Sequence, residues 1–210
     1  LGGGAGTNAI AFCQVYPDLT ATVFDLPATL SVTERTVKDA GLESRIALRP
    51  GDFTRDALGG PYDVVLMSDI LHYQTFQMNQ DLVKKVLAAL APGGRLVIKD
   101  RFLDEAGTGP AWTTAFAVHI LVNTQKGSCF QASEAMQWLN QALSTSLSIK
   151  DKENAAIIQL GLGVVDVVQE HPDPAAERLD FVFGPGRDPG AVGLQRQAAQ
   201  RLQGQPQQPP

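Results

Sequence analysis

The chain has 210 residues, 44% of them hydrophobic, which fits one α/β domain of ordinary size followed by a tail. Its formal net charge of −5, with no cluster of Lys and Arg to neutralise phosphates, argues against a nucleic-acid partner. Two distant cysteines, three histidines without ligand spacing and no apolar run near the ~20 residues of a membrane span predict no disulfide framework, no metal site and no membrane helix.

The predicted elements alternate between helices and strands. Apolar and amphipathic patterns predict helices over 7–15, 27–39, 82–90, 111–123 and 131–143, the third of them ended by Pro92-Gly93-Gly94. Runs rich in β-branched residues predict strands over 20–24, 45–49, 63–68 and 95–100, and a closing antiparallel pair over 144–149 and 155–160. The sequence therefore predicts a Rossmann-like, doubly wound and mostly parallel sheet with a C-terminal antiparallel strand pair.

The composition changes after about residue 163, where stretches rich in Pro and Gly begin and the last twenty residues hold seven Gln and three Pro. We expect one domain over residues 1–163 and a poorly ordered tail over 164–210. The first residues carry no basic stretch of the kind that opens a signal peptide. A cytoplasmic, reducing compartment is therefore the expected location.

The chain opens on a glycine-rich turn with the pattern G-x-G-x-G at Gly2, Gly4 and Gly6, and a predicted helix follows at once. Such a turn lets the backbone approach a ligand closely and directs helix N-terminal amides at it. A dinucleotide-binding turn would have a third glycine at position 7, where this chain has Thr7. The pattern therefore points to a nucleotide-like ligand and away from NAD and FAD.

Acidic residues follow the next two predicted strands. Asp25 lies 21 positions after Gly4, where a carboxylate can hydrogen-bond a ribose diol, and capping of the helix that begins at Pro27 is the alternative. Asp52 and Phe53 follow the predicted strand over 45–49, where they can contact an adenine ring. Ligands in open α/β sheets gather at this edge, but a turn carboxylate and a core phenylalanine would show the same pattern.

A histidine and an acid follow two later strands at the same edge. His72 comes four residues after the strand 63–68 and is a candidate general base, although a structural histidine is equally consistent with its spacing. Asp100 ends its strand and is placed to orient His72 or simply to end the strand. The aromatic residues of the later helices, Trp112, Phe116 and Trp138, are candidates either for a pocket wall or for the core.

These segments together resemble the catalytic domain of class I S-adenosylmethionine-dependent methyltransferases. The chain is most similar to the small-molecule O-methyltransferases, which include plant caffeate and flavonoid enzymes, acetylserotonin methyltransferase and bacterial polyketide-tailoring enzymes. The matching segments cover roughly residues 1–163 and are Leu1-Gly2-Gly3-Gly4-Ala5-Gly6, Val23-Phe24-Asp25-Leu26-Pro27, Pro50-Gly51-Asp52-Phe53, Asp63–Ser68 with Leu71-His72, and Leu90-Ala91-Pro92-Gly93-Gly94-Arg95-Leu96.

The resemblance implies S-adenosyl-L-methionine as cofactor, with S-adenosyl-L-homocysteine as product, and a hydroxyl of a small phenolic, polyketide or similar molecule as acceptor. It implies His72 as general base, supported by Asp100. The cofactor contacts that it implies are Gly2, Gly4, Asp25, Leu26, Asp52, Phe53 and Ser68.

The chain also departs from this family. Many members have Asp directly after the catalytic histidine, where this chain has Tyr73, and Cys129 replaces a second acid. The family's N-terminal helical domain and almost all of its first strand have no counterpart here. We therefore expect a fragment of a parent enzyme that dimerises through that domain, and we expect the isolated chain to bind the cofactor poorly.

Two other functions agree with parts of the sequence. A catalytically inactive, cofactor-binding fragment or partner module would explain the missing segments and the unusual tail. A nicotinamide-dependent oxidoreductase is built on a similar sheet, and Thr7 argues against it.

Overall fold

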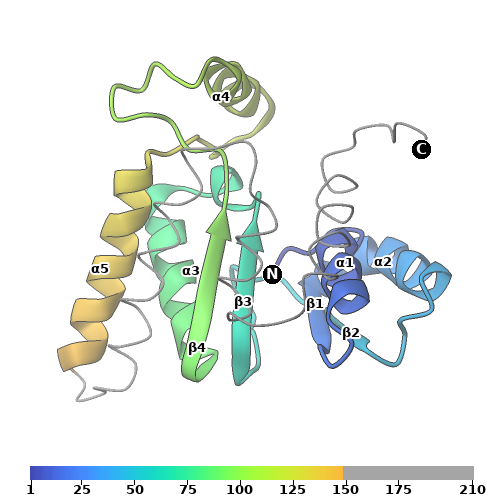
Figure 1. Cartoon of the computed structure of the whole chain (residues 1–210). Helices are drawn as coiled ribbons and strands as arrows, with labels where there is room; N and C mark the ends of the chain where they lie inside the picture. Colours follow the sequence, from blue (N-terminus) through green and yellow to red (C-terminus); the bar gives the residue numbers. More distant parts are fainter. Residues whose placement is uncertain (149–210) are drawn as a thin grey trace, which may run out of the picture. The chain divides into compact units, whose positions relative to one another are not determined.

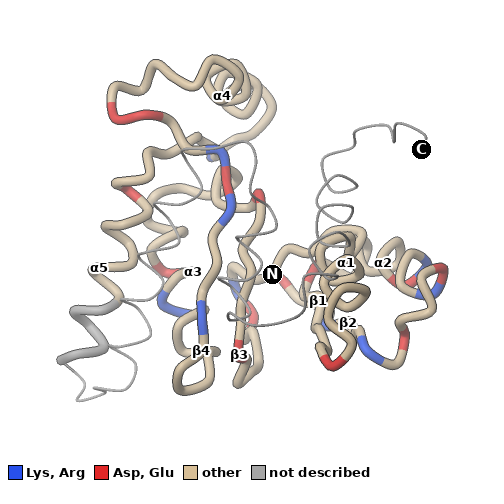
Figure 2. The backbone as a smooth tube through the Cα atoms, in the orientation of Figure 1, with Lys and Arg blue, Asp and Glu red and all other residues tan. Residues whose placement is uncertain are grey.

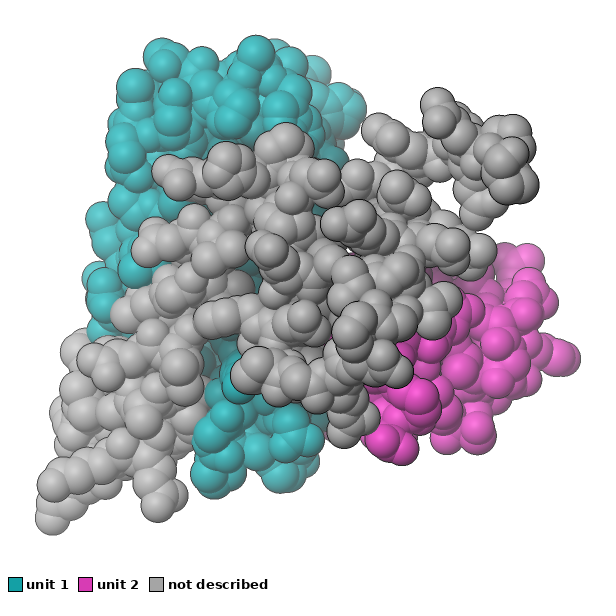
Figure 3. Space-filling model, viewed as in Figure 1, with its two compact units in different colours: residues 1, 53–171 teal, residues 2–52, 172–210 magenta. Residues whose placement is uncertain are grey.

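The computed structural model describes residues 1–148. These residues form two compact units, which Figure 3 colours separately: Gly2–Asp52 is one, and Leu1 with residues 53–148 is the other. The predicted strand 155–160 and the predicted tail 164–210 lie outside the described residues, so the boundary near residue 163 stays a prediction. Within residues 1–148, no helix combines the length and the apolarity needed to cross a bilayer.

The unit Gly2–Asp52 contains two helices and a two-stranded parallel sheet. In chain order they are α1 (Thr7–Val15), β1 (Ala21–Asp25), α2 (Pro27–Asp39) and β2 (Ile46–Pro50) (Figure 1). The strands pair in register from Ala21 opposite Ile46 to Asp25 opposite Pro50. Both helices have the bounds predicted from the sequence, and each strand is shifted by one residue.

The core of this unit joins both helices to the sheet through six buried side chains, Cys13, Val23, Leu30, Val37, Leu42 and Ile46. Arg45 closes the far end of α1, because its guanidinium donates to the carbonyl oxygens of Cys13, at 2.8 Å, and of Tyr16 and Leu19. A cation at the C-terminus of a helix satisfies carbonyl groups that have no partner within the helix.

The glycine turn is fastened to α2 by two threonines. The hydroxyl of Thr33, which is fully buried, donates to the carbonyl oxygen of Gly4 at 2.6 Å, and the hydroxyl of Thr36 donates to that of Ala5. Gly6 adopts φ 81° directly before α1, a conformation that favours glycine. The shape of the turn therefore depends on residues that lie 29 and 31 positions further along the chain.

The second unit also has a parallel strand pair. It contains β3 (Tyr62–Ser68), a short 3-10 turn η1 (Leu71–Tyr73), α3 (Phe76–Ala88), β4 (Leu90–Lys99), α4 (Ala111–Asn123) and α5 (Ala132–Ser148). β3 and β4 pair in register from Val64 opposite Arg95 to Ser68 opposite Lys99. The helix α3 packs on β4, α5 packs on α3, and α4 lies beyond the carboxyl ends of the strands (Figure 1).

The structure corrects the predicted bounds of one helix and one strand in this unit, because α3 begins at Phe76 and β4 begins at Leu90. The helix predicted over 82–90 is α3, which ends at Ala88, and Leu90 instead pairs with Tyr62 at the start of β4. The register shift between Tyr62 and Val64 accommodates the Pro-Gly-Gly segment inside the span of β4. Leu90 is therefore part of a strand because it pairs with β3, although the local apolar pattern predicts a helix there.

The strand predicted over 144–149 is wrong for the residues that the structure describes, because α5 continues through Ser148. The side chains of Trp138, Leu139 and Ala142 are buried at helical spacing. Packing of this face against α3 extends the helix over residues with only a local preference for strand.

Replacing Thr33 with Val is expected to lower the free energy of unfolding by about 1 to 3 kcal/mol, because the carbonyl group of Gly4 loses a buried donor. Urea unfolding followed by circular dichroism measures this change. The matched variant Thr22→Val, at an exposed position of β1, is expected to stay within about 0.5 kcal/mol of the unsubstituted chain. Equal losses in the two variants would contradict the role of the Thr33 hydroxyl.

Candidate active site

The residues singled out from the sequence divide between the two units. The unit Gly2–Asp52 holds Gly2, Gly4, Asp25, Leu26 and Asp52, and the other unit holds Phe53, Ser68, His72 and Asp100. Each group is described by itself. In the part of the chain that the structure covers, no three His, Cys, Asp or Glu side chains gather as metal ligands would.

Asp25 binds the glycine turn. Its Oδ2 accepts a hydrogen bond from the amide of Gly4 at 2.7 Å, and its Oδ1 accepts one from the amide of Leu26 at 2.7 Å. Leu26 is the N-cap residue of α2 and has no side-chain capping bond, so the bond from its amide to Asp25 is the contact of this carboxylate with the start of the helix. The amides of Gly2 and Gly3 donate to the carbonyl of Phe24, which places the turn at the carboxyl end of β1.

Glycine is present at different positions of the turn for different physical reasons. A Cβ on Gly3 would lie 2.6 Å from Cγ1 of Val23, and one on Gly6 would lie 2.9 Å from Cγ2 of Thr33. Gly4 has φ 54°, and a Cβ on this residue would meet no atom within 4 Å. Packing therefore requires glycine at positions 3 and 6, whereas Gly4 leaves open space where a Cβ would lie and its positive φ favours glycine. The need for Gly3 is not visible in the G-x-G-x-G pattern.

The ends of β1 and β2 meet beside this turn. The amide of Gly51 donates to the carbonyl of Asp25 at 3.0 Å, and a Cβ on Gly51 would collide with the ring of Phe24. Leu26, which follows β1, is 50% exposed, and Asp52, two residues after the end of β2, is half-buried. The carboxyl ends of these two parallel strands thus hold two carboxylates, those of Asp25 and Asp52, and the apolar side chain of Leu26.

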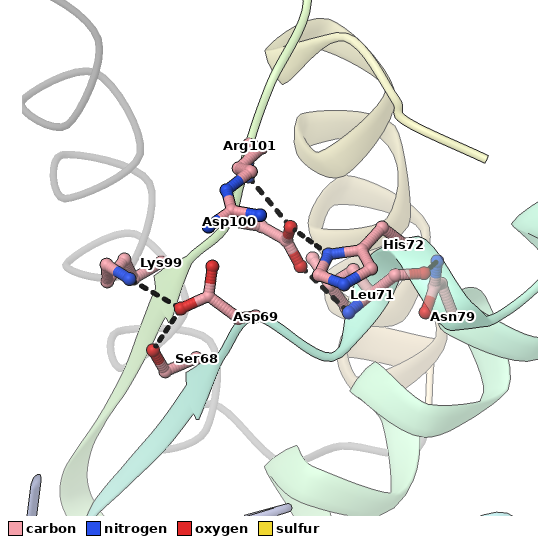
Figure 4. Close-up of polar contacts among 8 residues, drawn as sticks. All are labelled: Ser68, Asp69, Leu71, His72, Asn79, Lys99, Asp100 and Arg101. Carbon is pink, nitrogen blue, oxygen red and sulfur yellow. Dashed lines mark hydrogen bonds and ion pairs between the residues drawn. The ribbon is translucent and has the colours of Figure 1, made fainter. Parts of the chain in front are cut away.

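In the second unit, His72 and Asp100 form a buried pair (Figure 4). His72 lies in η1, just after β3, and Asp100 directly follows β4. The distance from Nδ1 of His72 to Oδ1 of Asp100 is 2.6 Å, and the two side chains are 3% and 4% exposed. Because an ionised carboxylate only accepts hydrogen bonds, Nδ1 carries the hydrogen in this pair, and Nε2 has a lone pair whenever the imidazole is neutral.

Both oxygens of Asp100 are also fixed by the backbone. Oδ2 accepts from the amide of Leu71 at 2.8 Å, and Oδ1 accepts from the amide of Arg101 at 2.7 Å. These donors offset the cost of removing the carboxylate from water and hold it in one orientation. Asp100 therefore fixes both the imidazole and the backbone of the turn that carries it.

The turn around His72 has two further supports that the sequence did not single out. Nδ2 of the fully buried Asn79, on α3, donates to the carbonyl of Leu71 at 3.0 Å. The amide of Ser128 donates to the carbonyl of His72 at 3.0 Å, and Gly127 packs so closely that a Cβ would collide with that carbonyl. A polar residue on the buried face of α3 was the only sequence signal for Asn79.

Ser68 ends β3 and its hydroxyl donates to Asp69 Oδ2 at 3.0 Å. Burial acts to raise the pKa of Asp69, but its hydrogen bond and ion pair with Lys99, the bond from Ser68 and the charge of Arg101 together lower that pKa below its ordinary value. Asp69 also has φ 57°, which is uncommon for a residue other than glycine. Asp69 therefore remains ionised over a wide range of pH.

The three candidate aromatic residues have different positions. Trp138 is fully buried and packs edge-on against Phe76 and Phe130, so it belongs to the core. Phe116, on α4, meets the ring of His72 edge-on with 5.0 Å between centroids, and Trp112 is 58% exposed on the same helix. The helix α4 therefore brings one aromatic ring, that of Phe116, to the histidine.

Comparison with known proteins identifies the family of this chain. A family profile described as "O-methyltransferase domain" matches residues 1–142. The 3-hydroxy-5-methyl-1-naphthoate 3-O-methyltransferase of Streptomyces sahachiroi is 33% identical over 142 residues, which are 68% of this chain and 41% of that enzyme. The L-tyrosine C(3)-methyltransferase of Streptomyces lavendulae is 32% identical over 126 residues, 60% of this chain and 34% of that enzyme.

A solved structure shows the same fold. The human N-acetylserotonin methyltransferase in complex with S-adenosylmethionine superimposes with a TM-score of 0.61 at 28% identity, over 68% of this chain and 40% of that chain. The chain thus spans about two fifths of the length of such relatives. The profile match over residues 1–142, together with the parallel α/β fold, shows that this chain belongs to the O-methyltransferase domain family of class I S-adenosylmethionine-dependent methyltransferases.

Proposed function

We propose that the protein to which this chain belongs is an S-adenosylmethionine-dependent O-methyltransferase that acts on a hydroxyl group of a small aromatic acceptor. The buried pair of His72 and Asp100, 2.6 Å apart after the carboxyl ends of two parallel strands, carries the proposal. The family match and the naphthoate-methylating relative support this reaction class. The relative's name describes a hydroxylated aromatic acceptor, which is the kind of molecule that such a base would activate.

The turn and the acids around it fit the cofactor. The uncovered backbone of Gly4 suits close approach of a ligand, and each oxygen of Asp25 keeps a second lone-pair site for a ribose hydroxyl after accepting from the backbone. The exposed side chain of Leu26 offers an apolar contact for the adenine. We propose that Gly2 and Asp52 complete the contacts of this unit, and that Phe53 and Ser68 supply those of the other.

S-adenosylmethionine, when bound, supplies a methyl group that the positive charge on sulfur makes electrophilic. The chain's own contribution is to the acceptor oxygen. Nε2 of His72 takes the proton of the acceptor hydroxyl, and Asp100 stabilises the resulting imidazolium through Nδ1. Burial of the pair excludes water, which would otherwise compete for the proton and solvate the oxygen.

Methylation of a ring carbon is the second candidate outcome, because a relative of similar identity is named as an L-tyrosine C(3)-methyltransferase. Removal of a phenolic proton increases electron density at the oxygen and also at the neighbouring ring carbons, so the same base serves both reactions. The position of the new methyl group, read by NMR spectroscopy of the product, distinguishes them.

Replacing Asp25 with Asn is expected to weaken binding of S-adenosylhomocysteine roughly 10-fold or more, because the amide offers one acceptor oxygen fewer beside the turn. Isothermal titration of the two chains, at protein concentrations high enough for the weak binding expected of an isolated fragment, measures the change. The matched variant Asp39→Asn, at the exposed end of α2, is expected to keep the affinity of the unsubstituted chain. Equal affinities for all three chains would remove Asp25 from the proposed cofactor site.

Replacing His72 with Gln is expected to lower kcat by roughly 10²- to 10⁴-fold, because no group then accepts the acceptor's proton. Asp100→Asn is expected to lower kcat as well, since an amide cannot stabilise an imidazolium as a carboxylate does. Transfer of a radiolabelled methyl group to mixed phenols provides the assay, and titration with S-adenosylhomocysteine shows that the cofactor site is intact. The exposed variant Asp63→Asn serves as control, and undiminished turnover by His72→Gln would refute the base assignment.

A further inference from the structure

The proposed mechanism makes no use of the charge of Arg101. Its guanidinium carbon lies 4.1 Å from the centre of the Phe116 ring and 4.7 Å from that of Trp112. Stacking on aromatic faces fixes the plane of a guanidinium and leaves its N–H groups pointing outward from the edge. Among the described residues, none accepts a hydrogen bond from this guanidinium, and its backbone amide alone is bonded, to Asp100.

The neighbouring carboxylates are already engaged. Both oxygens of Asp100 accept other hydrogen bonds, from His72 and from backbone amides, and Asp69 is paired with Lys99. Lys99, Asp100 and Arg101 follow one another in the sequence, and Figure 2 shows positive and negative residues alternating where β4 ends. Neither of these carboxylates therefore accepts a hydrogen bond from the guanidinium. The positive charge of Arg101 nevertheless acts at a distance, where it helps to lower the pKa of Asp69 and opposes the rise that burial causes in the pKa of Cys129.

This cation and the candidate base share one aromatic residue. Phe116 contacts the guanidinium with its face and meets the ring of His72 edge-on, with 5.0 Å between centroids. The two distances limit the separation of guanidinium and imidazole to their sum, which one substituted aromatic ring system can span. Trp112 is 58% exposed and Phe116 is half-buried, so a molecule from solvent can reach these two rings.

We propose that Arg101 binds a carboxylate of the methyl acceptor while the acceptor's hydroxyl lies at His72, so that the acceptor is an aromatic hydroxy acid. The planar fork of a guanidinium matches a carboxylate with two parallel hydrogen bonds, which fixes orientation as well as charge. Trp112 and Phe116 hold this fork in place and offer faces to the acceptor's ring. This inference rests on the proposed methyl transfer, because His72 defines the other end of the acceptor.

Two acceptors that differ only in the carboxylate test the proposal on the full chain: 3-hydroxy-1-naphthoic acid and 2-naphthol. The unsubstituted chain is expected to favour the acid in kcat/KM by roughly 10- to 100-fold, as expected for a charge-assisted pair of hydrogen bonds. Arg101→Gln is expected to bring this ratio close to one, and Arg101→Lys to leave an intermediate ratio because it keeps the charge without the fork. Because each variant is judged by a ratio, a general loss of folded protein cancels.

The control is Lys84→Gln, which removes a positive charge from an exposed pair with Asp81 on α3 and is expected to keep the ratio of the unsubstituted chain. A ratio near one in the unsubstituted chain, or an unchanged preference in Arg101→Gln, would overturn the proposal.

Titration of the acid in the presence of S-adenosylhomocysteine separates this proposal from the proposed function. Binding that depends on Arg101, without methyl transfer to either acceptor, would support the carboxylate site and refute the reaction. Methylation of 2-naphthol with binding of the acid that is indifferent to Arg101 would support the reaction and refute the carboxylate site.

Discussion

The hydrogen bond between Nδ1 of His72 and Oδ1 of Asp100 is the interaction on which the geometry of the candidate site in the second unit depends. A carboxylate buried to this degree is costly unless it is fully hydrogen-bonded. Asp100 meets that requirement with the imidazole and two backbone amides, those of Leu71 and Arg101. The bonds that stabilise the buried carboxylate thus also orient the histidine, so stability and positioning have one cause.

The parallel pairing of β3 and β4 makes this contact possible. Ser68 pairs with Lys99 at the last register position, so the residues that follow the two strands leave the sheet side by side. Asp100 follows one strand at once, and the turn η1 brings His72 back toward it after the other. Asn79 and Ser128 then fix the backbone of that turn from two further segments. The residue types at a strand end supply chemistry only when such supports hold them.

The glycine turn is likewise held in place by contacts from other segments, and here the groups that are held belong to the backbone. Asp25 ties the turn to the end of β1, and Thr33 ties it to α2. Gly3 and Gly6 allow the tight packing on Val23 and Thr33, and Gly4 is left uncovered. The strand end and α2 therefore hold the turn in one conformation, with open space where a Cβ of residue 4 would lie.

The sequence by itself determined the local elements and the residue types of the candidate site. The helices 7–15, 27–39 and 111–123 have the bounds that their apolar spacing and turn residues predict, because such signals act over a few neighbouring positions. The parallel α/β class and the family resemblance also follow from the sequence, and the profile match confirms the family. The catalytic and cofactor roles of the individual residues stay proposals.

Tertiary structure decided what depends on residues far apart in the chain. Leu90 joins a strand because it pairs with Tyr62, and residues 144–148 stay helical in an element that packs on α3. Trp138 proved to be a core residue, and Phe116, with a similar sequence signal, lies beside His72. Burial, strand register and the partner of a side chain are set by long-range packing, and no local pattern encodes them.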